Sequence, residues 1–124
     1  MSILFLEYPK CSTCQKAKKW LDAHNVSYTD RHIKEENPTA EELKIWHEKS
    51  GLDLKKFFNT SGMLYKEMGL KDKLPDMTID EQYALLATDG MLVKRPLVVT
   101  DTAVLTGFKE TDWEKALQNE QYST

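Results

Sequence analysis

Cys11 and Cys14 lie three positions apart near the start of the chain and have the clearest chemical potential. An apolar run precedes them and a helical pattern follows, so we expect Cys11 just before a helix and Cys14 on the same side of it. Unpaired N–H groups there favour a thiolate, and we expect the pKa of Cys11 to fall below ~8.5. Cys14, one turn further on, can attack an adduct on Cys11 and leave a Cys11–Cys14 disulfide. The spacing predicts a redox-active pair, with two inert buried thiols as the alternative.

The same helix start is suited to an oxyanion, because the N–H groups of residues 12–14 point at the space above Cys11. Ser12 and Thr13 are therefore candidate binding residues, and Lys10 adds a nearby positive charge. Arg95, directly before Pro96, is the best candidate for a further cation. Its alternative is an ordinary surface ion pair. We expect the substrate to be a small oxyanion or a thiol compound.

A metal site is the weakest interpretation of these cysteines. Zinc needs four ligands, and His24, His32 and His47 have no metal-ligand spacing with one another. We therefore expect no metal and no bound cofactor.

The elements around the cysteines predict a βαβ unit. Residues 3–6 form a short apolar strand, and residues 26–29 form a second strand. Between them a helix begins at Ser12, which with Gln15 fits a capping box. Lys16, Lys18 and Lys19 form the solvent face of that helix.

The remaining chain predicts several helices and then a hairpin. Thr39 and Thr78 each open a helix as part of a capping box, with Glu42 and Glu81 as the partners, and Gly51 ends the first of these. Strands over residues 97–99 and 103–105 follow as an antiparallel pair, and a last helix is capped at Thr111. The expected fold class is α/β, a small mixed four-stranded sheet flanked by helices, in a single domain over residues 1–124.

Composition narrows the function. The chain has 124 residues with 17 basic and 20 acidic side chains, a net charge of −3, which argues against direct nucleic-acid binding. No apolar run is long enough to span a membrane, and residues 3–6 do not make a signal peptide. We expect a cytoplasmic protein.

Four segments in order resemble one family over nearly the whole chain: residues 8–14, residues 57–62 with 65–70, residues 92–99, and residues 104–108. The resemblance is to the arsenate reductase family in its thioredoxin-fold, glutaredoxin-linked branch, which also contains the Spx transcriptional regulators. It implies a thioredoxin-like fold with a helical insertion over about residues 36–90. It also implies a cis peptide before Pro96 that places Arg95 beside the cysteine loop.

For chemistry, the resemblance implies that Cys11 attacks arsenate and that Arg95 grips the oxyanion. An external thiol donor, glutathione with glutaredoxin or thioredoxin, completes the reduction. Two further arginines of the reductases are replaced here, one by Asn59 and the other near Phe108. Asn59 and Pro96 are further candidate substrate-binding residues. Cys14, in contrast, matches the second cysteine of Spx.

Two functions follow from this pattern. The first is a thiol oxidoreductase of arsenate reductase type, in which Cys11 attacks and Cys14 resolves. The second is a redox-sensing regulator like Spx that binds the RNA polymerase α subunit. Gly51 lies near the turn that Spx regulators use for this contact, although a glycine that simply ends a helix is the alternative.

Overall fold

The computed structural model describes residues 3–122, which divide into two compact units. The first contains the chain up to His32 and again from Arg95 onward, and the second is Ile33–Lys94. All four strands belong to the first unit, whereas the second is built from helices and turns. Residues 1–2 and 123–124 of the expected single domain lie outside the described residues, and the single-domain organisation stays a prediction.

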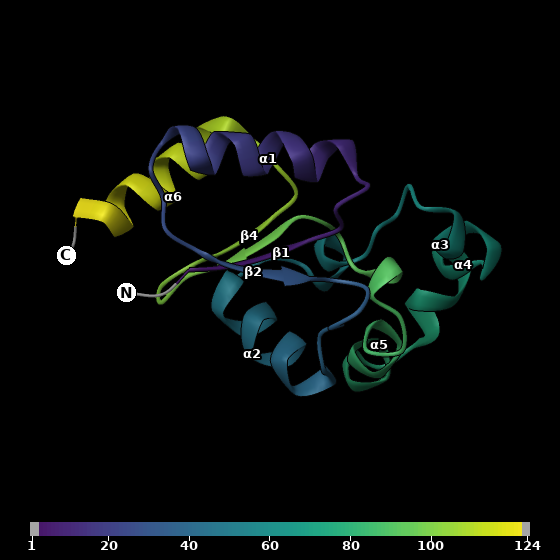
Figure 1. The fold of residues 1–124 in the computed structure, drawn as a ribbon. Helices are drawn as coiled ribbons and strands as arrows, with labels where there is room; N and C mark the ends of the chain where they lie inside the picture. Colours follow the sequence, from purple (N-terminus) through teal and green to yellow (C-terminus); the bar gives the residue numbers. More distant parts are fainter. Residues whose placement is uncertain (1–2, 123–124) are drawn as a thin grey trace. The chain divides into compact units, whose positions relative to one another are not determined.

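The first unit contains a four-stranded sheet with the order β2-β1-β3-β4 (Figure 1). β1 (Leu4–Glu7) and β2 (Thr29–His32) are parallel and are joined by the helix α1 (Ser12–Ala23). β3 (Leu97–Val99) runs antiparallel to β1, and β4 (Val104–Thr106) runs antiparallel to β3. The parallel pair needs the α1 crossover and the antiparallel pair needs only a short turn. The expected mixed sheet, βαβ unit and hairpin are confirmed.

α1 and α6 (Glu110–Tyr122) lie on the same face of this sheet (Figure 1). The core between them consists of buried side chains from both helices and the inner strands: Ile3, Phe5, Ala17, Leu21, Val26, Val98, Trp113 and Leu117. Phe5 packs edge to face against Tyr28 and Trp113, with centroid distances of 5.4 and 6.3 Å. Complete burial of a phenylalanine contributes about 2–3 kcal/mol, so this core fixes α1 and its cysteines on the sheet.

The strands predicted over residues 3–6 and 103–105 lie one residue later in the structure, and two other predicted boundaries in the first unit are wrong. The second strand is Thr29–His32 and not residues 26–29, because Val26 packs into the core beneath α1. Pairing with β1 decides where β2 lies, and its own residues are polar or half-buried. The last helix begins at Glu110, and the Trp113 N–H already bonds to the Lys109 carbonyl. Thr111 is therefore inside the helix and does not cap it.

The second unit contains α2 (Ala40–Ser50), α3 (Met63–Glu67), α4 (Leu70–Lys73) and α5 (Ile79–Leu86). Short 3-10 turns lie at Leu54–Phe57, Leu74–Asp76 and Gly90–Leu92. Both capping boxes, at Thr39 and at Thr78, have reciprocal hydrogen bonds with the glutamate three residues on. Gly51 ends α2 in the left-handed conformation, with φ at 67°. These helix starts and this helix end confirm the sequence predictions.

Backbone contacts join the end of the second unit to its middle. Phe58 and Val93 form an isolated antiparallel bridge. The Asn59 N–H donates to the Leu92 carbonyl, and the Lys94 N–H donates to the Phe57 carbonyl, both at 2.8 Å. These bonds bring the end of the helical segment back to its middle.

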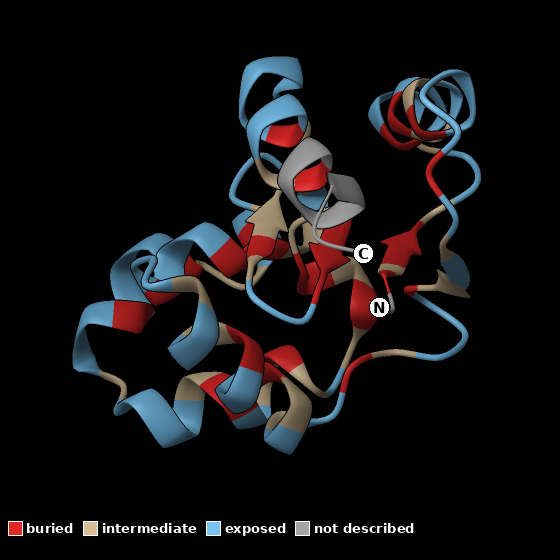
Figure 2. Ribbon diagram, turned by 90° about the vertical axis from the view of Figure 1, so that its left-hand side faces the viewer, coloured by how far each residue is buried: buried red, intermediate tan, exposed pale blue. Residues whose placement is uncertain are grey.

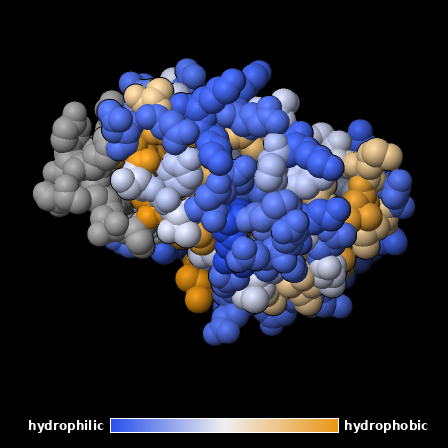
Figure 3. Space-filling model, in the orientation of Figure 1, coloured by the Kyte–Doolittle hydropathy of each residue, from blue (hydrophilic) through white to orange (hydrophobic). Residues whose placement is uncertain are grey.

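Burial follows the pattern expected of amphipathic elements. Figure 2 shows buried residues along the strands, while the helices alternate between buried and exposed positions. On the face drawn in Figure 3, hydrophilic residues predominate. Among the described residues, the exposed large hydrophobic side chains all belong to the second unit: Ile45, Leu52, Met63 and Ile79. Across residues 3–122, none of the helices is long and apolar enough to cross a membrane.

Candidate active site

Cys11 occupies the N-cap of α1, where the backbone changes from extended to helical. Its φ of −84° and ψ of 123° are extended, and its carbonyl accepts the first helical bond from the Gln15 N–H at 3.0 Å. The prediction that Ser12 caps the helix is wrong, since Ser12 is the first helical residue. A capping side chain belongs to the last extended residue. The Cys11 sulfur therefore takes the position from which a serine hydroxyl would cap a helix.

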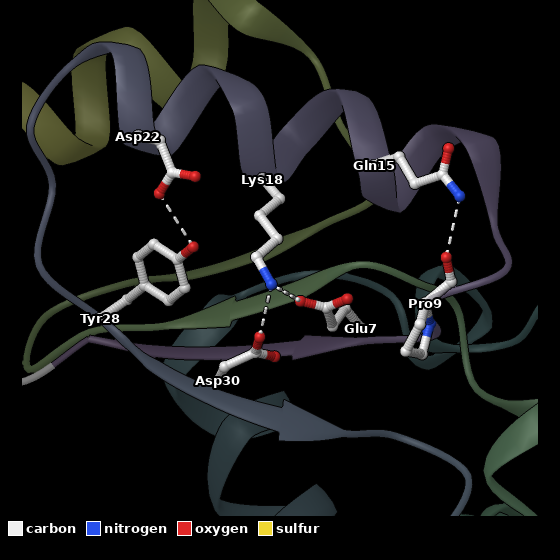
Figure 4. Close-up of polar contacts among 7 residues, drawn as sticks. All are labelled: Glu7, Pro9, Gln15, Lys18, Asp22, Tyr28 and Asp30. Atoms are coloured by element: carbon white, nitrogen blue, oxygen red, sulfur yellow. Dashed lines mark hydrogen bonds and ion pairs between the residues drawn. The ribbon is translucent and has the colours of Figure 1, made fainter.

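The loop before Cys11 is held by two hydrogen bonds. The Cys11 N–H donates to the Tyr8 carbonyl at 2.9 Å. The Gln15 side chain reaches back and donates to the Pro9 carbonyl at 2.9 Å (Figure 4). The loop is thereby bonded through Tyr8 and Pro9 to the N-cap and the first turn of α1, which orients Cys11 at the helix start.

The pKa of the Cys11 thiol is lowered from its ordinary value. Partial burial raises this pKa, but several groups outweigh it by stabilising the thiolate. The Cys14 N–H and thiol, and then the Thr13 N–H, donate toward the sulfur, and the Arg95 charge adds to them. This matches the sequence expectation for a thiol at a helix start, with the N–H groups of the first turn as the physical cause.

Cys14 is the opposite of Cys11. It is completely buried against the sheet, and burial raises its pKa to about 12 despite a hydrogen bond from the Tyr8 N–H. The neighbouring Cys11 raises the Cys14 pKa further, since two adjacent thiolates repel each other. Both cysteines are free thiols in this structure. The pair thus consists of one accessible thiol whose pKa is lowered and one buried thiol whose pKa is raised.

Arg95 lies directly before Pro96 across a cis peptide bond, as the family resemblance implies. Its guanidinium carbon lies 5.4 Å from the centroid of the Tyr8 ring, within the range of a cation–π contact. Its charge lowers the pKa of both thiols. The half-buried Arg95 therefore interacts electrostatically with both cysteines.

The other candidate residues differ in their burial and in the unit to which they belong. Lys10, Ser12 and Thr13 are exposed around Cys11, and Pro96 is buried beside Arg95. Asn59 belongs to the second unit, where it is half-buried and its side chain lies against Gly62. The structure thus groups the first-unit candidates with Cys11, whereas a role for Asn59 stays a prediction.

A charged cluster around the buried Glu7, at the end of β1, was not foreseen from the sequence. Glu7 is only 5% exposed, and Lys18 of α1 lies 3.7 Å from its carboxylate (Figure 4). Lys18 also bonds to Asp30 of β2 at 3.0 Å. Lys18 therefore does not belong to a purely solvated helix face, because it reaches down from α1 to two carboxylates on the sheet. The available signal was a glutamate that ends an apolar strand, which is a costly place for a charge.

Glu7 makes the stability of the protein depend on pH. Burial, together with Asp30, raises the pKa of Glu7 to about 7 against the lowering effect of Lys18. The folded state thus binds this proton more tightly than the unfolded state, and stability falls as pH rises from about 4.5 toward 7. We expect the free energy of unfolding to drop by roughly 1–3 kcal/mol across this window, and Glu7→Gln to remove most of the drop.

Urea unfolding at several pH values between about 5 and 8 measures this effect. Glu114→Gln, at an exposed position on α6, is the matched control and should keep the wild-type slope. Parallel pH profiles for wild type and Glu7→Gln would show that the Glu7 carboxyl does not titrate in this range.

Among the described residues, histidine, cysteine, aspartate and glutamate side chains form no group that could hold a metal ion. His32 instead makes a T-shaped contact with the Tyr8 ring, with centroids 5.8 Å apart. His47 bonds through Nδ1 to the Tyr83 hydroxyl at 2.7 Å within the second unit. Both histidines thus have structural contacts in the first and second unit, respectively.

The mixed sheet, the Cys-x-x-Cys pair at the start of α1 and the cis-proline define a thioredoxin-like protein. More narrowly, the sequence matches the ArsC family over residues 6–116, and the chain belongs to that family. The predicted fold class and family are confirmed.

Three curated relatives show how the family divides. Bacillus subtilis (strain 168) YusI is 58% identical over 93% of this chain and 98% of that protein. The regulatory protein MgsR from the same strain is 31% identical over 86% of this chain and 82% of its own length. The global transcriptional regulator Spx of Staphylococcus epidermidis is 29% identical, covering 88% and 82% of the two chains. The relatives therefore include named transcriptional regulators.

Two solved structures share the fold closely. A proposed ArsC family related protein from Bacteroides fragilis has a TM-score of 0.90 and 65% identity, covering 93% of this chain and 97% of that one. A possible arsenate reductase from Streptococcus mutans UA159 has a TM-score of 0.83 and 48% identity, covering 90% and 97%. Relatives named for enzymes and relatives named for regulators therefore share this architecture.

Proposed function

We propose that the chain is a thiol oxidoreductase of the ArsC family, in which the Cys11 thiolate attacks an oxyanion or a disulfide and Cys14 resolves the adduct. The unequal pair of thiols carries this proposal. Cys11 is accessible with a lowered pKa, while Cys14 is buried with a pKa near 12. Such a pair performs two sequential exchanges in a fixed order.

With a disulfide substrate, the Cys11 thiolate attacks one sulfur and forms a mixed disulfide, and the other sulfur leaves as a thiolate. Cys14 then loses its proton and attacks the Cys11 sulfur. The substrate thiolate leaves, and the enzyme holds a Cys11–Cys14 disulfide. The substrate gains two electrons over the two steps, and the cysteine pair loses them.

With arsenate, the Cys11 thiolate attacks arsenic, and one oxygen leaves as water after protonation. Attack of Cys14 on the Cys11 sulfur breaks the sulfur–arsenic bond and leaves two electrons on arsenic. Arsenite departs, and the same Cys11–Cys14 disulfide remains. Arg95 would hold the anion by charge, with Lys10 and the N–H groups of Ser12 and Thr13 around it.

The disulfide must be reduced by an external thiol donor, either glutathione with glutaredoxin or thioredoxin. No bound cofactor is part of the proposal, because the two cysteines hold both electrons. These donors belong to the reducing cytoplasm, which is where we propose that the protein works.

Replacing Cys14 with serine tests the order of the two exchanges. The first exchange should still occur, because Cys11 keeps the N–H groups of the first turn. The second should stop, so the variant should accumulate about one substrate thiol per chain as a mixed disulfide on Cys11. Intact-protein mass spectrometry after incubation with oxidised glutathione measures the adduct, and peptide mapping locates it.

Wild type should release the adduct and show an intramolecular disulfide in the same experiment. An adduct on neither cysteine, or equal adducts on both in wild type, would contradict the proposed order. Coupled NADPH oxidation with arsenate, run separately with glutathione–glutaredoxin and with thioredoxin, identifies the substrate and the donor.

The second candidate is a redox-sensing regulator that binds the RNA polymerase α subunit. The likeness to MgsR and Spx supports it, as does the exposed turn at Gly51. If this function holds, oxidised wild type should retain purified α subunit on a column, and Cys11→Ser should retain less. Equal, background-level retention of oxidised and reduced protein would exclude it.

A further inference from the structure

Tyr8 contacts both cysteines through its backbone and Arg95 through its ring. Its carbonyl accepts the Cys11 N–H at 2.9 Å, and its N–H donates to the Cys14 sulfur. Its ring lies under the Arg95 guanidinium and makes a T-shaped contact with the His32 ring. All five residues belong to the first unit. The backbone of Tyr8 is thus bonded to the cysteine pair while its side chain supports the nearby cation.

Arg95 and His32 both contact the Tyr8 ring, and Arg95 lies over its face. An aromatic ring is negative on its faces and positive at its edge, and a cation is attracted to the face. The Arg95 guanidinium lies over the ring at 5.4 Å, while the His32 and Tyr8 planes meet at 84°. Both contacts use the ring itself and neither uses the hydroxyl. A phenylalanine would therefore preserve them, and an aliphatic side chain would not.

We propose that the Tyr8 ring is a positioning residue, which holds the Arg95 guanidinium where its charge acts on the Cys11 sulfur and on a bound anion. This inference rests on the proposed function, since Arg95 is the cation of that site. The half-buried Arg95 side chain is long and has many rotamers, and a fixed aromatic surface restricts them. Because Tyr8 is bonded through its backbone to both cysteines, its ring has a fixed relation to the sulfur atoms.

The variants Tyr8→Leu and Tyr8→Phe test the ring directly. The readout is the rate of Cys11 alkylation by iodoacetamide as a function of pH, located by peptide mass. Tyr8→Leu should slow alkylation about 3- to 10-fold at a pH below the wild-type Cys11 pKa and should move the profile to higher pH. Tyr8→Phe should stay within about twofold of wild type. A merely structural role for the ring would lower stability without moving the pH profile.

A double-mutant cycle with Arg95→Gln shows whether the ring acts through the guanidinium. In the Arg95→Gln background, Tyr8→Leu should have almost no further effect on the alkylation profile. Full additivity of the two changes, or an effect of Tyr8→Phe as large as that of Tyr8→Leu, would overturn the inference. If Tyr8→Leu does not fold, Tyr8→Met takes its place in the cycle, and the Tyr8→Phe comparison still holds.

Failure of this inference is distinguishable from failure of the proposed function. Turnover that needs Cys11 together with an unchanged alkylation profile in Tyr8→Leu would remove only the role of Tyr8. A shifted profile in Tyr8→Leu together with turnover that survives Cys11→Ser would remove the oxidoreductase proposal and keep the ring contact.

Discussion

Replacing Cys11 with serine should abolish turnover, with a loss on the order of a thousandfold or more. A serine hydroxyl stays protonated near neutral pH and cannot form the disulfide that the second exchange requires. The fold should survive, because serine is among the preferred N-cap residues and Cys11 occupies the N-cap. We therefore expect an inactive protein whose thermal stability equals or exceeds that of wild type.

Coupled NADPH oxidation with arsenate, and reduction of a small disulfide, measure this loss with both donor systems. Lys16→Ala, an exposed change on the same helix, is the matched control and should keep full activity. Turnover in Cys11→Ser within about tenfold of wild type would mean that the chemistry occurs elsewhere in the protein.

Replacing Gly90 with alanine should destabilise the protein by about 3 kcal/mol or more. A Cβ atom there would collide with the Ile33 carbonyl oxygen and would lie 3.0 Å from the Lys34 Cα. Both obstacles are backbone atoms, which cannot turn aside as a flexible side chain could. Overpacking typically costs 1–3 kcal/mol when side chains can adjust, and this site allows less adjustment. Urea unfolding of the variant measures the cost.

Gly51→Ala provides the comparison for Gly90→Ala. Gly51 has a φ of 67°, but a Cβ atom there would have open space around it. Alanine should therefore cost only the left-handed strain, about 1–2 kcal/mol. Equal losses in the free energy of unfolding for the two variants would contradict the prediction that backbone contacts at Gly90 exclude a Cβ atom.

Local hydrogen bonding made much of the fold predictable. The capping boxes at Thr39 and Thr78 and the left-handed Gly51 depend on residues within one turn, so their sequence patterns determine the outcome. β2 was misplaced because an edge strand is selected by its partner, here β1, and not by its own polar residues. The apolar side chain of Val26 packs in the core with residues of α1, and Val26 does not belong to a strand.

The candidate site was predictable where the chemistry depends on position in a helix. Cys11 and Cys14 at the start of α1 follow from spacing alone, although the sequence assigned the cap to Ser12. The cis peptide before Pro96 followed from the family resemblance and not from local pattern. The Glu7–Lys18 contact and the Tyr8–Arg95 contact join residues from different elements, and no local pattern identifies them.

A direct titration of the two thiols tests the unequal pair most directly. The ultraviolet absorbance of the thiolate would be followed with pH in reduced wild type, Cys11→Ser and Cys14→Ser. One thiol should titrate below its ordinary value and should be missing in Cys11→Ser, while the other should remain protonated until about pH 12. Two thiols that titrate together near the ordinary cysteine pKa would contradict the proposed roles of Cys11 and Cys14.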